Sequence, residues 1–300
     1  MSRARPAPTG PPPPPAVQAV AIRYGKRGPL RFASHRVLQR AFERAVRRAE
    51  LPVAYSAGFT PHLRLSYIGA APTGAASEAE YLVLRLTAAI GAAQTLELLN
   101  GNLPAELPVL DAVVVPDAAR RGFADLLNAS EWQIELPGAD RDQTEAAVRT
   151  LMGLDQFRIV QSRSGGPPAP GAKAKPPREV DVRASLVNLA VRPAPPGDLG
   201  EDANSVQPAT AWPAPDDRLA PQSGHLGVLK TSAGGHCAIL DAVLRHATPA
   251  VRPGDVAAVL EQIGLELAAP PRATRLTQGT YSVETGTVEE PFSRLRLKAS

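Results

Sequence analysis

The sequence predicts an α+β protein made of two ferredoxin-like halves, each with the element order βαββαβ. Three observations lead to this prediction. Apolar residues alternate in several short segments, segments with helical apolar spacing separate them, and this order recurs once along the 300 residues. Because hydrophobic residues make up 44% of the chain and aromatic residues only 4%, the predicted core consists mainly of Ala, Val and Leu.

The first half begins with a predicted strand at residues 17–24, where the residue pattern alternates as in a strand. The segment Leu30-Arg31-Phe32 is expected to extend this strand or to pair with it. Ser34 is a good helix N-cap and precedes an amphipathic helix at 35–50. The remaining elements of this half are expected as strands at 52–55, 63–68 and 80–87, a short helix at 95–99 and a strand at 107–115.

The second half repeats the order more faintly. A helix at 253–263 is well marked, because Pro253 stands at its start and Gly264 just after its end. The other expected elements are strands at 132–136, 157–161, 180–191, 226–230 and 275–278, and helices at 140–153 and 236–247.

Proline marks the segments outside these halves, since 19 of the 32 prolines lie in residues 1–15 and 164–222. Such composition is typical of disordered tails and flexible linkers. The predicted organisation is a disordered tail at 1–15, a first domain at 16–118 that contains the basic helix, a second domain at 119–290 interrupted by loops at 164–177 and 193–222, and a C-terminal tail at 291–300.

Composition excludes several classes of protein. No run of 18 apolar residues is present, so no membrane-spanning helix is expected, and the polyproline run Pro11–Pro15 stands where a signal peptide would be apolar. The single Cys237 excludes a disulfide framework and a cysteine-ligated zinc or iron–sulfur site within the chain. We therefore expect a cytoplasmic protein with no metal site and no cofactor of its own.

Positive charge is concentrated near the N-terminus. Residues 1–50 carry eleven Arg or Lys against two Glu, whereas the rest of the chain is net acidic although the whole has a net charge of +4. Four arginines (Arg36, Arg40, Arg44 and Arg48) follow one another at i, i+4 on the predicted helix, with Arg47 beside them. Like charges at this spacing destabilise a helix slightly, so the row suggests an anionic partner. The alternative is a solvated face whose arginines pair with acids elsewhere in the fold.

A short loop after this helix combines aromatic and basic residues. Tyr55 and Phe59 flank Gly58, and Arg64 follows; Arg31 precedes the helix. Exposed aromatic rings beside arginines can stack on unpaired RNA bases. We favour slightly a core position for Phe59 beneath its own loop. The predicted nucleic-acid-binding set is Arg31, Arg36, Arg40, Arg44, Arg47, Arg48, Tyr55, Phe59 and Arg64.

His35 and His62 are the candidate catalytic residues. Metal-independent RNA cleavage needs a base and an acid, which two histidines can supply, and a helix N-terminus disfavours the charged form of His35. A capping or loop role for each histidine is the simpler interpretation. Glu78 and Glu80 alternate on one predicted strand and are expected mainly as surface partners for nearby arginines.

The segment from residue 20 to 87 resembles the radical-SAM-linked (radical-SAM-associated) proteins, a bacterial family of unknown function. The resemblance rests on an ordered series of short matches. These are Arg31-Phe32, Ser34-His35, Leu38, Arg40, Arg44-Ala45, Arg47-Arg48, Leu51-Pro52, Tyr55-Ser56, Gly58-Phe59, Pro61-His62, Ser77 and Glu80-Tyr81. The chain departs from the family pattern at three positions. The family has an acid where this chain has Val37 and Val83, and a second Pro where it has Leu63.

The resemblance implies a link to a radical-SAM enzyme that acts in trans. Three hypotheses follow from the residues and the resemblance. The favoured one is a non-catalytic module that binds RNA or presents a substrate. The alternatives are a metal-independent endoribonuclease that uses His35, and an adapter whose arginine helix docks on an acidic protein surface.

Overall fold

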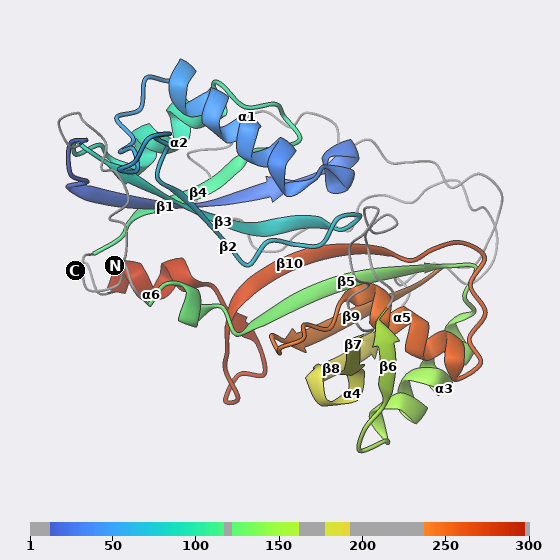
Figure 1. The fold of residues 1–300 in the computed structure, drawn as a ribbon. Coiled ribbons are helices and arrows are strands. Elements are labelled where there is room, and N and C mark those ends of the chain that lie inside the picture. The colour runs from blue at the N-terminus through green and yellow to red at the C-terminus, as the bar shows by residue number, and fades with distance from the viewer. Residues whose placement is uncertain (1–12, 117–121, 162–177, 193–236, 298–300) are drawn as a thin grey trace, which may run out of the picture.

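The computed structural model describes residues 13–116, 122–161, 178–192 and 237–297. Both helices and strands are present, and most strands join one nine-stranded mixed sheet (Figure 1). The order along the sheet is β4-β1-β3-β10-β5-β9-β8, with β2 paired to β3 and β11 paired to β10. The prediction of a fold that combines helices with a sheet is therefore confirmed.

The N-terminal half comprises β1 to β4 with α1 and α2. β1 pairs antiparallel with both β3 and β4, and β2 pairs antiparallel with β3, which gives the order β4-β1-β3-β2. The elements are β1 (Gln18–Lys26), the 3-10 helix η1 (Gly28–Phe32), α1 (His35–Arg48), β2 (Leu65–Ile68), β3 (Ala76–Leu86), α2 (Ala92–Asn100) and β4 (Val109–Val114).

Alternation along β1 explains why this half has two apolar faces. Val20, Ile22 and Tyr24 pack in one cluster with residues of α1 and α2, whereas Ala19 and Ala21 belong to a different cluster on the opposite face. Successive side chains of a strand point to opposite sides, so the unbroken apolar run from Ala19 to Ile22 requires cover on both faces. The small alanines suit the face on which Tyr81, Phe123 and Phe292 pack.

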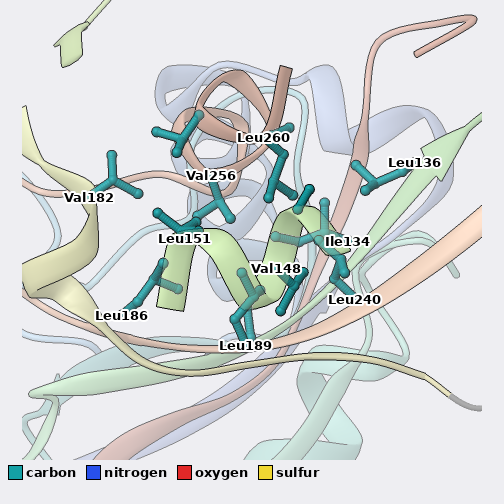
Figure 2. Packing of buried hydrophobic residues seen from close by; sticks show 14 of the residues in the cluster. Ile134, Leu136, Val148, Leu151, Val182, Leu186, Leu189, Leu240, Val256 and Leu260 are labelled. Carbon is teal, nitrogen blue, oxygen red and sulfur yellow. The ribbon is translucent and has the colours of Figure 1, made fainter. Parts of the chain in front are cut away.

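The C-terminal half has the strand order β10-β5-β9-β8, again antiparallel throughout. α3 and α5 cover one face, and Figure 2 shows Val148, Leu151, Val256 and Leu260 from these helices packed over strand residues such as Ile134. The elements are η3 (Ala124–Leu126), β5 (Ala129–Pro137), α3 (Arg141–Met152), β6 (Arg158–Gln161), β7 (Arg178–Asp181), α4 (Val182–Ser185), β8 (Leu186–Val191), β9 (Cys237–Arg245), α5 (Pro253–Gln262), β10 (Arg272–Tyr281), β11 (Val288–Glu289) and α6 (Pro291–Leu297).

The two halves meet where β3 and β10 pair in parallel, with Thr274 opposite Ala76 and Arg275 opposite Ser77. We call this contact the junction. Figure 1 shows α1 and α2 over β1, β3 and β4, and α3 and α5 beside β5 and β9 at the other end of the sheet. The sheet is therefore continuous from one half to the other.

Residues 291–297 were expected to be part of a C-terminal tail, and this expectation is wrong for them. They form α6, whose Phe292 and Leu295 are each 1% exposed. Phe292 packs edge-on against Tyr81, with ring centroids 5.5 Å apart. α6 thus covers the face of the N-terminal sheet that α1 and α2 leave open.

Four expected elements differ in the structure. Residues 237–245, expected within a helix at 236–247, form strand β9 between β5 and β8. Side chains at alternate positions of β9 are buried: Ala238, Leu240, Ala242 and Leu244. The sequence of this short apolar run fits a strand and a helix alike, so its periodicity does not decide between them. Leu30-Arg31-Phe32 lies in η1 after Pro29 rather than in a strand.

Residues 52–55 form no strand, because only isolated bridges join Val53 to Leu86 and Tyr55 to Leu63. The expected strand at 180–191 is split, since the single turn α4 separates β7 from β8. The expected loops at 164–177 and 193–222, the strand at 226–230 and most of the tail at 1–15 lie outside the described residues. In the part of the chain that the structure describes, no helix is both long and apolar enough to span a membrane.

Candidate nucleic-acid interface

The arginine row lies on the outer face of α1. Leu38, Phe42, Ala45 and Val46 are buried against the sheet, and the spacing of these four residues turns the arginines away from the core. Arg36, Arg40, Arg44, Arg47 and Arg48 are all exposed. Within the described residues none of the five forms an ion pair, so the expected alternative of acidic partners elsewhere in the fold finds no support there.

The loop that carries Tyr55 and Phe59 projects into solvent. The Ser56 hydroxyl accepts a hydrogen bond from the His62 backbone N–H at 3.0 Å, and the Ser56 backbone N–H donates to the His62 carbonyl at 2.8 Å. Gly58 has a φ of 140°, which side-chain-bearing residues rarely adopt. Tyr55 is 40% exposed and Phe59 71% exposed. The slight preference for a core position of Phe59 is therefore wrong.

His35 lies at the start of α1, on its β2 side. Its ring packs edge-on against Tyr67 of β2, with centroids 4.9 Å apart. Burial, with a smaller effect from Glu43, raises the pKa of Tyr67 well above its usual value, so the Tyr67 hydroxyl stays protonated. His62 is exposed in the loop, and no described contact joins the two histidines.

Arg31 has a different environment from the row. Its Nε donates to the Gly74 carbonyl at 2.8 Å, and its Nη2 donates to the Ala273 carbonyl at 3.1 Å. Burial lowers the pKa of this guanidinium. Arg31 therefore ties η1 to the turn before β3 and to β10. Arg64 is exposed just before β2.

Sequence reasoning missed a buried polar cluster at the junction. Arg275 forms an ion pair with Glu80, and its Nε donates to the Ser77 hydroxyl at 3.3 Å. Lys26 donates from Nζ to the Pro72 carbonyl at 3.2 Å. Glu80, Lys26 and Arg275 are at most 3% exposed. The expectation of surface acids holds for Glu78, which pairs with Arg27 at 2.6 Å, but is wrong for Glu80.

The charge state of this cluster follows from its contacts. Burial alone would raise the pKa of Glu80, but Arg275, the Ser77 hydroxyl, Lys26 and the Ala71 backbone N–H together hold that pKa below its usual value. Burial lowers the pKa of Lys26, and Glu80 partly opposes this shift. One sequence signal does point to this cluster. Ser77 and Glu80-Tyr81 are among the positions that match the radical-SAM-linked proteins.

Among the described residues, no group of three or more His, Cys, Asp or Glu side chains is placed to hold a metal ion. The functional candidates instead gather on α1 and on the loop before β2, while Arg31 and the junction cluster hold the halves together.

No curated protein matches the chain. A bacterial family does match it: the family described as "uncharacterized protein conserved in bacteria" (DUF2344) covers residues 20–253. The matched span includes α1 with its arginine row, the Phe59 loop and Glu80, and it extends through β9. Because the match covers most of the chain and runs through both halves of the sheet, this protein belongs to the DUF2344 family.

Proposed function

We propose that the protein is a non-catalytic module that binds RNA through the arginine face of α1. The observation that carries the proposal is the set of five exposed arginines on one helix without ion-pair partners among the described residues. An unneutralised row of guanidinium groups attracts phosphate, and arginine can bind phosphate with two hydrogen bonds at once. Such contacts give affinity with little sequence preference.

The geometry of the row favours a flexible strand that lies along the helix. Four residues advance an α-helix by about 6 Å, so successive arginines of the row can meet successive phosphates of an extended chain. The exposed Phe59 and Tyr55 rings offer surfaces on which unpaired bases can stack. We therefore propose single-stranded RNA as the ligand, with the Phe59 loop as a second contact.

The test compares three outer arginines with three arginines elsewhere. In Arg36→Gln/Arg40→Gln/Arg47→Gln, we expect binding of a fluorescein-labelled single-stranded RNA to weaken at least tenfold at 0.1 M salt. The slope of log K against log salt should become shallower by about 2, since each lost phosphate contact contributes about 0.7. Fluorescence anisotropy across a salt series in EDTA measures both quantities.

The matched control is Arg149→Gln/Arg158→Gln/Arg178→Gln, which removes the same charge from exposed positions in the C-terminal half. Binding that falls equally in both variants would mean that net charge alone holds the RNA. No binding by the wild-type protein at low salt would refute the proposal and leave the row as a docking surface for an acidic protein.

Phe59→Ala tests the stacking contact separately. Because Phe59 is 71% exposed, we expect the free energy of unfolding to change by at most about 0.5 kcal/mol. RNA affinity should fall about fivefold or more, as stacking contributes about 1–3 kcal/mol per base, while the salt slope stays the same. Unchanged affinity in this variant would remove the loop from the interface.

The same reactions discriminate between binding and cleavage. RNA recovered intact from the EDTA incubations supports the binding module. Specific cuts that disappear in His35→Ala, with binding retained, would instead establish the endoribonuclease alternative. The resemblance to radical-SAM-linked proteins supports a further proposal, that the bound RNA is presented to a radical-SAM enzyme in trans. We also propose a cytoplasmic location, because the sequence has no run of 18 apolar residues and its single cysteine forms no disulfide framework.

We also propose that each half is a ferredoxin-like domain, with boundaries at residues 16–118 and 119–290. The orders β4-β1-β3-β2 and β10-β5-β9-β8 support this proposal. When the sheet strands of each half are numbered in chain order, both halves have the antiparallel order 4-1-3-2. In each half one helix connects strands 1 and 2, and another connects strands 3 and 4.

A further inference from the structure

A groove runs along the side of α1 that faces away from β2. It lies between α1, η1 and the segment that connects α2 to β4, and its volume is about 570 Å³. This volume is within the range of small-molecule sites in proteins. The groove shares Arg44 and Arg48 with the arginine row, whereas Arg36, Arg40 and Arg47 do not line it.

The groove walls are mainly aliphatic. Apolar side chains come from all three walls: Leu30, Val37, Leu38, Leu103, Pro104 and Leu107. Val37 is 47% exposed although it is apolar, and it is also a position where the sequence departs from the acid of the resembled family. No aromatic side chain lines the groove, so a nucleic-acid base would find no ring to stack on there.

Two cations complete the groove. Arg44 and Arg48 both line it, one helical turn apart on α1. Both are exposed, and within the described residues neither has an ion-pair partner. No acidic residue is among the lining side chains. An occupant with a negative group would therefore relieve the repulsion between the two guanidinium groups and accept their hydrogen bonds.

We propose that this groove is a binding site for a small amphipathic anion, an aliphatic carboxylate or an aliphatic phosphate ester. The aliphatic body packs on Leu30, Val37 and Leu103, and the anionic head lies between Arg44 and Arg48. This inference does not rest on RNA binding, although Arg44 and Arg48 belong both to the arginine row and to the groove.

The test is isothermal titration calorimetry of the full chain with decanoate, below the concentration at which decanoate forms micelles. We expect one site with a dissociation constant of about 1 mM or tighter, the range that about a dozen ligand atoms can support. Acetate, which lacks the aliphatic body, and decyltrimethylammonium, which has the opposite charge, should not bind measurably.

Three variants locate the site. Arg44→Gln/Arg48→Gln removes the cations, and Val37→Trp fills the groove from an exposed position; each should weaken decanoate binding at least tenfold. Arg36→Gln/Arg47→Gln removes the same charge from the same helix outside the groove and should bind like the wild type. Circular dichroism of each variant establishes that it folds.

The outcomes separate the possible occupants. Absence of decanoate binding, equal binding of decyltrimethylammonium, or retained binding in folded Val37→Trp would each overturn the proposal. If decanoate does not bind but single-stranded RNA binds more weakly to Arg44→Gln/Arg48→Gln and Val37→Trp, the groove belongs to the RNA surface instead. The RNA proposal is judged separately, by RNA binding of the wild-type protein and by the comparison of Arg36→Gln/Arg40→Gln/Arg47→Gln with its control.

Discussion

Replacing Glu80 with alanine is expected to lower the free energy of unfolding by about 3–5 kcal/mol, the usual cost of breaking a buried ion pair by removing one partner. The change leaves Arg275 and Lys26 as buried cations at the junction without their carboxylate. It also removes the acceptor of the Ala71 backbone N–H. Urea denaturation followed by circular dichroism measures the loss.

Two controls show that the loss belongs to the buried pair. Glu78→Ala removes a carboxylate two residues away on the same strand, but the Glu78–Arg27 pair is partly exposed, so we expect a loss of at most about 1 kcal/mol. Glu80→Leu/Arg275→Met replaces both charges with apolar groups and should be less damaging than Glu80→Ala. A loss in Glu80→Ala as small as that in Glu78→Ala would contradict the assigned role.

The same pair predicts a pH dependence. Because contacts in the folded protein lower the pKa of Glu80, the carboxylate stabilises the fold at pH values above its unfolded pKa of about 4.3. This contribution is lost as pH falls through the lower, folded pKa. We expect the wild type to lose more stability than Glu80→Leu/Arg275→Met between pH 5 and the acid range, as measured by urea denaturation at each pH.

Phe292→Ala is expected to lower the free energy of unfolding by about 3–5 kcal/mol, the typical cost for a buried phenylalanine. Phe292 is 1% exposed and packs against Tyr81 and Phe123. Its removal would leave a cavity under α6, on the face of the N-terminal sheet formed by Ala19 and Ala21. Thermal and urea denaturation both measure the effect.

Phe59→Ala is the matched control, because it makes the same substitution at a largely exposed position and should change stability by at most about 0.5 kcal/mol. If Phe292→Ala were as mild as Phe59→Ala, the packing of α6 would contribute little to the stability of the core.

Local patterns predicted the elements with strong periodicity. Six elements begin and end within a few residues of the predicted segments: β1, α1, β3, β5, α3 and α5. Their prediction succeeds because the apolar spacing and the residues that start or stop each element lie within or next to the segment. The i, i+4 spacing also predicted one row of arginines along α1, and in the structure this row lies opposite the buried Leu38 and Phe42.

The wrong predictions share a different cause. Residues 237–245 carry apolar residues that fit helix and strand alike, and pairing with β5 and β8 decides between the two. Phe59 is apolar enough for a core position, but the loop from Tyr55 to Leu63 closes on itself through Ser56 and His62 and leaves the ring outside.

The sequence by itself determined the α1 amphipathicity, the concentration of positive charge and the resemblance of residues 20–87, since each depends on residues close together in the chain. Only the tertiary structure decided that Glu80 meets Arg275, that Phe292 fills a core, and that Arg44 and Arg48 line a groove with Leu103 and Leu107. Each of these contacts joins residues far apart in sequence, and their energies come from burial and charge pairing that exist only after the sheet has formed.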